Sequence, residues 1–477
     1  MKKIILKISV LALIVVGFTS CDSELEQVPF DSFGNENAYQ SAKDFDNAIR
    51  GAYSGLTSGA LYGGSDGGGM LDAPDVLADN VTTAQAGRGS RRDLHNWRYT
   101  ASDGPMFGLY NAAYVTANRV NLILENIDNL EGETKDNIIA EAKAIRALVH
   151  FNAVSFFGKI PTQSGDANGS LGVAYVTTAD ANMLPARDNV GSVYDNIVAD
   201  LTDALANINE SNPEGRLDKE AVATLLSRVY LYMGKNDLAA STANMVSTKP
   251  AAIDNVVGVW EDASQDGLLF SIPNEVGVLG IGVGVTWGQG SNLNNFKPEF
   301  VVAYDFFTMF EDEDIRKDAF IAQASNAGSD FNIVKKQLGR DGLTDGTVDI
   351  KILRAAEAYL NKAEANFRLG NETAARNALD EVRSRRYSSF AGGETGSALL
   401  DAIKLERRLE FAFEGQRFFD IKRWGQGVDR GGFGDLADGS GVPTDEQTLP
   451  AGSNKLQMPI AQGVIDVNNN IQQNPGY

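Results

Sequence analysis

The sequence predicts an all-α protein in which helix pairs pack with long loops and a few short strands. Three observations predict this class. Apolar residues recur at three- and four-residue spacing over most of the chain after residue 40, and the alternation typical of strands is scarce. Two predicted helix pairs also share a residue pattern around their turn glycines. Hydrophobic residues make up 43% and charged residues 22% of the 477 residues, a composition typical of a globular chain.

The predicted helices follow one another along the body of the chain. The first, residues 41–55, places Phe45, Ile49 and Ala52 on one face. The same spacing predicts helices over residues 107–127, 136–157, 190–208, 219–233, 237–246, 350–369, 373–385 and 396–424. The best strand candidates are residues 268–272 and 276–285. The glycine-rich stretches 62–70 and 277–290 are predicted loops.

Two of these helix pairs can be superposed on their turn glycines, Gly234 and Gly370. The shared pattern pairs Val229 with Ala365, Leu231 with Phe367, Met233 with Leu369, Ala239 with Ala375 and Val246 with Val382. Small residues after the turn let the second helix lie close to the first, which is typical of tetratricopeptide-like pairs. Chance similarity between two amphipathic hairpins is the alternative.

The N-terminus predicts export and lipidation. A basic segment, 1–7, precedes a nine-residue apolar run, 8–16, which is too short to span ~30 Å of hydrocarbon. Residues 17–21 resemble a bacterial lipobox, whose cysteine is acylated, and Cys21 is the only cysteine of the chain. We therefore predict a signal peptide over 1–20, an acidic tether over 21–30 that begins at lipidated Cys21, and a body over 31–477. An ordinary secretory signal beside an incidental cysteine is the alternative.

Composition and charge exclude several function classes. The formal net charge is −21, or −24 without Lys2, Lys3 and Lys7, and such a chain repels nucleic-acid phosphates. One cysteine and two histidines exclude an internal disulfide, a cysteine-rich zinc site and a histidine-rich metal site. The chain has no nucleophile elbow, P-loop or dinucleotide fingerprint. The sequence therefore predicts neither an enzyme nor a cofactor.

Carboxylates lie close together in the sequence at three places, where they could serve catalysis or bind a metal ion. Glu406, Glu410 and Glu414 lie one helical turn apart, and two acids can serve a glycosidase. Arginines at helical spacing would neutralise them, so we predict structural ion pairs. The other two places are the acidic run 312–314 and the aspartates at 341, 345 and 349. Neither matches a calcium loop, so we predict solvated surface, with an opportunistic calcium site as the alternative.

Four stretches in order along the chain resemble the SusD/RagB family. Residues 136–161 resemble its helix that ends in aromatic-Gly-x-Ile/Val-Pro, and residues 353–383 its Leu-Arg-x-Ala-Glu hairpin. Residues 403–424 resemble its Glu-Arg…Arg-Trp-Gly helix, and residues 458–477 its Gln-Asn-Pro-Gly-Tyr ending, with Ala461 in place of a proline. Together with the lipobox, these matches extend from residue 21 to residue 477.

The resemblance implies a lipoprotein anchored at the outer membrane and exposed on the cell surface. It implies capture of oligosaccharide or polysaccharide, without cleavage, and delivery to a SusC-like TonB-dependent transporter by a hinged lid. It also implies an N-terminal part with helix pairs over about 31–220 and a C-terminal part over about 260–477. The alternatives are a lipid-anchored tetratricopeptide-like scaffold for outer-membrane assembly and a surface glycoside hydrolase.

Aromatic residues in loops are the predicted glycan-binding site, because sugar C–H faces stack on aromatic rings. Trp97 and Trp287 lie in polar loops flanked by glycine or arginine, and Tyr62 lies in a glycine-rich loop. The predicted hydrogen-bonding neighbours are Asp75, Asp79, Asn80 and Arg98. A tryptophan packed in the helical core is the alternative for both indoles. The acidic charge favours a neutral glucan or fructan, although an arginine patch around residues 88–98 would weaken that preference.

Overall fold

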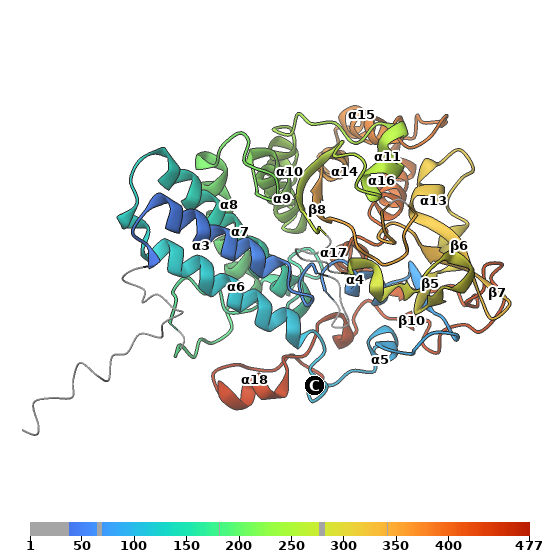
Figure 1. The fold of residues 1–477 in the computed structure, drawn as a ribbon, viewed down its shortest axis with the longest axis horizontal. Helices are drawn as coiled ribbons and strands as arrows, with labels where there is room; N and C mark the ends of the chain where they lie inside the picture. The colour runs from blue at the N-terminus through green and yellow to red at the C-terminus, as the bar shows by residue number, and fades with distance from the viewer. Residues whose placement is uncertain (1–37, 64–68, 181, 276–281, 341) are drawn as a thin grey trace, which may run out of the picture.

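A computed structural model describes residues 38–63, 69–180, 182–275, 282–340 and 342–477. Cys21 with its tether, and residues 276–281 of one predicted strand, lie outside the described residues. The described part consists mainly of helices joined by long loops, with short strands at one side, as the sequence predicts (Figure 1). No helix in this part is both long enough and apolar enough to cross a bilayer.

Five long helices build the N-terminal half at the left of Figure 1. They are α3 (Ala42–Leu56), α6 (Phe107–Glu125), α7 (Glu133–Phe157), α8 (Val190–Asn207) and α9 (Lys219–Tyr232). Helix α3 begins at a capping box, in which the side chains of Ser41 and Asp44 each accept a backbone N–H of the other residue. Each long helix packs against the next, because its apolar stripe must be buried against a neighbour.

The two predicted hairpins are confirmed. Helix α9 turns into α10 (Asn236–Ala243) at Gly234, and α14 (Ala355–Arg368) turns into α15 (Glu372–Arg383) at Gly370. The φ angles of the two glycines are +71° and +80°, a left-handed conformation that closes a helix without a Cβ clash. Helix α10 packs on α14, so the pairs form one continuous stack that continues into α16 (Gly396–Glu410).

Two predicted helices are wrong in part. The predicted helix 350–369 begins as strand β8 (Ile350–Arg354), which pairs antiparallel with β2 (Leu268–Ile272), the predicted strand. A short apolar run fits either period, so the sequence could not separate strand from helix there.

The predicted helix 396–424 is interrupted between α16 and α17 (Arg417–Arg423). Phe413 and Gly415 take φ of 64° and 76° in that turn, which no helix can include.

Strands that the sequence analysis missed form small antiparallel pairs. The longest is the hairpin of β6 (Ile321–Asn326) and β7 (Ser329–Val334), and β1 (Val81–Thr83) pairs with β5 (Phe300–Val302). Two-residue strands pair β3 (Gly288–Gln289) with β4 (Lys297–Pro298), and β9 (Val428–Asp429) with β10 (Thr448–Leu449). Residues 283–285 of the predicted strand 276–285 belong instead to the 3-10 helix η4 (Val283–Thr286).

Shorter helices connect these elements. They are α4 (Ala73–Val76), α5 (Arg92–His95), η1 (Ile127–Asn129), η2 (Ala167–Gly169), η3 (Ile253–Asn255), α11 (Val256–Trp260), η5 (Leu293–Asn295), α12 (Tyr304–Phe307), α13 (Ile315–Phe320), η6 (Asn454–Leu456) and α18 (Gln462–Val467).

The C-terminal segment, residues 456–477, packs back onto the N-terminal helices. The Met458 N–H donates to the Phe156 carbonyl at 2.8 Å, and the Asn474 amide donates to the Phe157 carbonyl at 2.8 Å. The ring of Tyr477 stacks on Tyr99 with centroids 6.4 Å apart. Met458 belongs to the same buried cluster as the side chains of α3, α6 and α7. The predicted parts 31–220 and 260–477 therefore share one core.

Structural ion pairs at the three glutamates of residues 406–414 are confirmed, but their partners are basic residues from outside this helix and not the arginines at helical spacing. Glu410 is fully buried and accepts from Arg354 at 2.7 Å and from Arg386 at 2.8 Å. Burial alone would raise the pKa of Glu410, but the two guanidinium groups hold it well below its usual range. Glu406 pairs with Arg316 and Arg383, and Glu414 with Lys336 and Arg354. A general acid needs a raised pKa, so this cluster does not suit glycosidase chemistry.

Aspartates of both acidic runs form ion pairs with basic side chains of the protein. Asp314 pairs with Arg316 at 2.8 Å, and Asp349 pairs with Arg340 at 2.7 Å; both aspartates are buried, which corrects the prediction of solvated surface. Asp312 does lie at the surface, where it pairs with Lys317, and Asp341 lies outside the described residues. Within the described ranges, no group of three or more His, Cys, Asp or Glu side chains could hold a metal ion.

Candidate functional site

Trp97 is buried, which corrects the prediction that it forms an exposed platform. Only 5% of the residue is exposed, and its Nε1–H donates to the Leu77 carbonyl at 3.1 Å. The Arg430 guanidinium lies 3.9 Å from the ring centroid and covers one face. The polar residues next to Trp97 in the sequence do not indicate that it is buried, because the groups that contact its ring come from distant positions in the chain.

Trp287 and Tyr62 are buried as well, so neither offers a free ring face. Trp287 is 1% exposed and donates from Nε1 to the Gln337 side-chain oxygen at 2.9 Å. The Tyr62 hydroxyl exchanges hydrogen bonds with the Asn152 amide between the helices. None of the three predicted rings has the exposed face that stacking on a sugar requires.

The predicted polar neighbours hold the fold together. Asp79 accepts two hydrogen bonds from Arg417, at 2.7 and 2.8 Å, and Asn80 donates to Asp75 at 2.8 Å. Burial raises the pKa of Asp75 to about 6. Burial would also raise the pKa of Asp79, but Arg408 and Arg417 hold it at about 2. All three acidic or amide side chains are buried, so none of them faces an open site in this structure, and their role in glycan binding stays a prediction.

Arg98 alone among the predicted site residues is well exposed. Its guanidinium pairs with Asp445 at 3.3 Å and with Glu446 at 3.1 Å, and roughly half of the side chain faces solvent. These pairs join the loop after α5 to the loop before β10. The structure therefore does not bring the seven predicted residues together around one open site.

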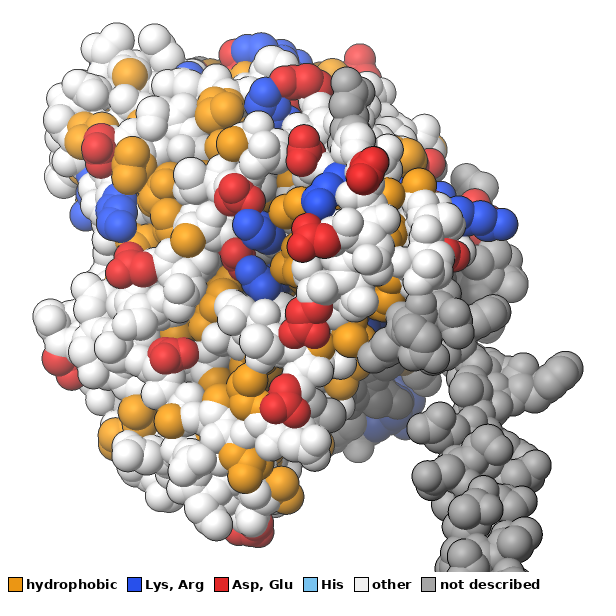
Figure 2. Space-filling view, turned by 90° about the vertical axis from the view of Figure 1, so that its left-hand side faces the viewer, with side chains coloured by type: hydrophobic (Ala, Val, Ile, Leu, Met, Phe, Trp, Pro, Cys, Tyr) orange, Lys and Arg blue, Asp and Glu red, His pale blue; other side chains and the backbone are white. Residues whose placement is uncertain are grey.

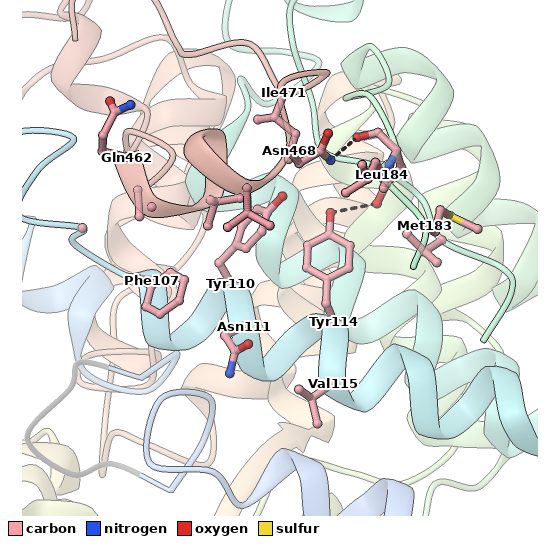
Figure 3. Close-up of a pocket in the computed structure, with 18 of the residues that line it drawn as sticks. Phe107, Tyr110, Asn111, Tyr114, Val115, Met183, Leu184, Gln462, Asn468 and Ile471 are labelled. Atoms are coloured by element: carbon pink, nitrogen blue, oxygen red, sulfur yellow. Dashed lines mark hydrogen bonds between the residues drawn. The ribbon is translucent and has the colours of Figure 1, made fainter. Parts of the chain in front are cut away.

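What the structure does bring together is a groove of about 910 Å³, shown in Figure 3. Its floor is a stripe of α6, in which Phe107, Asn111 and Val115 follow at four-residue spacing and so share one helix face. Tyr110 and Tyr114 stand beside that stripe in Figure 3. One wall is α18 with the residues after it, and the other wall is the connection 174–185.

Hydrogen bonds fix the walls of this groove. The Tyr114 hydroxyl donates to the Ala174 carbonyl at 2.9 Å, and the Asn468 amide donates to the Pro185 carbonyl at 2.9 Å, both drawn in Figure 3. The Asn470 amide donates to the Leu184 carbonyl at 2.8 Å, and the Gln462 N–H to the Ala101 carbonyl at 3.0 Å. The groove is therefore formed before anything binds in it.

Large apolar side chains are unusually exposed in this groove. Leu184 is 52% and Val467 75% exposed, and Phe107, Val115 and Met183 are also exposed. Elsewhere, the face at the left of Figure 1 carries small hydrophobic areas interspersed with charged side chains (Figure 2). A concentration of exposed apolar residues with a polar edge marks an interaction surface. The described lining residues include Asp103 and Asp180 but no lysine or arginine.

The groove offers apolar surface that a protein segment could cover. Its lining combines aliphatic side chains, such as Val176, Leu184 and Val467, with aromatic rings and polar side chains. The sequence carries one signal of this surface, which is the second apolar stripe of α6 at Phe107 and Val115. The two walls come from positions too far apart in the chain to be paired by pattern alone.

Comparisons with known proteins agree with this fold. Residues 61–231 match a family described as "Starch-binding associating with outer membrane", and residues 329–477 match the SusD family. SusD-like protein P2 of Formosa agariphila is 25% identical over 475 residues, covering 89% of this chain and 91% of that protein. The starch-binding protein SusD of Bacteroides thetaiotaomicron is 33% identical over 130 residues, covering 27% of this chain and 22% of that protein.

Solved structures share the architecture. The crystal structure of a SusD superfamily protein from Bacteroides thetaiotaomicron superposes with a TM-score of 0.79 at 25% identity. The superposition covers 91% of this chain and 100% of that one.

Proposed function

Because the chain is a member of the SusD-like family, we propose that it is a glycan-binding lipoprotein of the bacterial cell surface. Acylated Cys21 would hold the body at the outer membrane through the acidic tether. The body would bind oligosaccharide or polysaccharide without cleaving it, for nutrient uptake. Its formal charge of −21 supports a neutral glucan or fructan over a polyanion, because like charges repel.

A SusC-like TonB-dependent transporter is the proposed partner, on which the protein would act as a hinged lid. The single observation that supports docking is the groove between α6 and α18, with its exposed aliphatic side chains. Burying such side chains against a partner contributes roughly 25 cal/mol per Å² before the costs of association. We propose that an apolar segment of the transporter occupies this groove, with basic residues beside Asp103 and Asp180.

Co-purification tests this docking surface. In cells that express both proteins, the double substitution Leu184→Asp and Val467→Asp should abolish recovery of the transporter with this protein after mild detergent extraction. Both side chains are more than half exposed, so the substitutions should leave the fold intact. The matched control is Leu369→Asp with Leu405→Asp, two exposed leucines outside the groove. Undiminished recovery of the transporter with the groove variant would reject this surface.

Cys21→Ala tests the anchor and the location. We expect the variant to leave the membrane fraction and remain folded, because acyl chains supply the attachment. Protease added to intact cells should digest the wild-type body. Protection of the body until the outer membrane is opened would favour the periplasmic scaffold instead.

A further inference from the structure

Tyr304 and Phe433 form an exposed aromatic pair that shares no residue with the groove. Tyr304 begins α12, and Phe433 lies in the loop between β9 and β10. Their ring centroids are 5.2 Å apart, with an angle of 57° between the planes. Phe433 is 45% exposed and Tyr304 is partly exposed, unlike the buried rings of Trp97 and Trp287.

The loop that carries Phe433 is held in place by many hydrogen bonds. Asp435 accepts from the Gln85 N–H at 2.8 Å and from the Val442 N–H at 2.9 Å, and the Ala437 N–H donates to the Asp330 carbonyl at 2.9 Å. A Cβ at Gly439, whose φ is +82°, would lie 2.6 Å from the Tyr304 ring. Glycine there lets the ring lie against the loop backbone. A ligand would therefore meet rings that are already positioned, which lowers the entropic cost of binding.

Polar groups lie beside the two rings. A Cβ at Gly432 would lie 3.1 Å from the Gln447 side-chain oxygen, so that exposed amide lies against the backbone that precedes Phe433. A Cβ at Gly431 would lie 2.9 Å from one Asp305 carboxylate oxygen. The other Asp305 oxygen is buried and has no hydrogen-bond partner among the described residues. An amide and a carboxylate are the groups that bind sugar hydroxyls, and a carboxylate repels uronate and sulfate groups.

We infer that Tyr304, Phe433 and Gln447 form a stacking site for neutral sugar rings, with Asp305 at its edge. The site rests on the proposed glycan-binding function and gives that function a place in the fold. It also separates the two tasks of the molecule. Sugar would bind at the ring pair, and the partner would bind at the aliphatic groove.

Calorimetry on purified protein tests the site with amylopectin, laminarin and inulin as neutral probes and alginate as the acidic probe. The wild type should bind a neutral polysaccharide and not alginate. Phe433→Ala should weaken that binding about 2- to 12-fold, and Phe433→Trp should preserve it. Phe390→Ala is the matched control, since it removes another exposed phenylalanine ring, and it should bind like the wild type.

The outcomes separate the site from the proposed function. Wild-type affinity in Phe433→Ala would overturn the site and leave glycan binding standing. A wild type that binds none of the three neutral polysaccharides would overturn both. A preference for alginate would overturn the neutral ligand class. A lower melting temperature in Phe433→Ala, with binding lost in Phe433→Trp as well, would show that the loop serves stability and would also overturn the site.

Discussion

Single residues in this protein take their roles from partners that lie far away in the sequence. The charge spacing around Glu410 predicts ion pairs, but its partners Arg354 and Arg386 lie outside that helix. The environment of Trp97 is set by the Leu77 carbonyl and by Arg430, and no local pattern contains them. Neither the burial of this indole nor the partners of the buried glutamates could therefore be predicted from local patterns.

Trp97→Ala and Trp287→Ala should each lower the free energy of unfolding by about 3–5 kcal/mol, because each removes a large buried side chain and leaves a cavity. Urea denaturation measures the loss. Phe390→Ala, which removes an exposed ring, is the control and should change stability by less than about 1 kcal/mol. Stable tryptophan variants that had lost only glycan binding would instead restore these residues to the binding site.

Among the elements, helices with a clear 3.6-residue period were predictable, and breaks or short strands were not. The helices 190–207 and 219–232 end within a residue of their predicted limits. The β6–β7 hairpin was missed because its strands, IAQASN and SDFNIV, are polar and alternate weakly. The break before α17 depends on a close approach between Gly415 and the Met70 carbonyl, which only the folded chain creates.

The two turn glycines Gly370 and Gly415 should respond differently to alanine. Gly370 has φ of +80° and open space around it, so Gly370→Ala should cost only about 1–2 kcal/mol of conformational energy. A Cβ at Gly415 would lie 1.7 Å from the Met70 carbonyl oxygen, so Gly415→Ala must also displace backbone. Its loss in unfolding free energy should be clearly larger in the same denaturant series. Equal losses would show that the turn between α16 and α17 relaxes easily.

Across the whole molecule, buried ion pairs join segments that are distant in the chain. Asp79 and Arg417, 338 residues apart, connect the N-terminal loops to α17. The pKa of Asp79 is lowered to about 2 by Arg408 and Arg417 against the effect of burial. A carboxyl group with a depressed pKa stabilises the fold fully above its unfolded pKa, near 3.9, and loses that contribution as pH falls through its folded value.

The free energy of unfolding should therefore fall as pH is lowered from about 4 to 2, with Asp79 contributing on the order of 2 kcal/mol. Asp79→Asn should be less stable at pH 7 and should show a shallower decline below pH 4. Denaturation at a series of pH values measures both slopes. Asp203→Asn, which breaks a more exposed pair with Lys143, should keep the wild-type slope. A slope unchanged in Asp79→Asn would assign the acid sensitivity to other carboxyl groups.

The return of residues 456–477 to the first helices also affects how the protein is made. Residues 456–477 are synthesised long after α7, and Met458 and Asn474 complete contacts with its end. The N-terminal helices cannot reach their final packing while synthesis is still under way, and contacts of such long sequence separation form slowly. A prematurely terminated product would expose apolar surface at the end of α7. Proteases and chaperones act on such exposed surface, so copies that lack this segment would be open to removal.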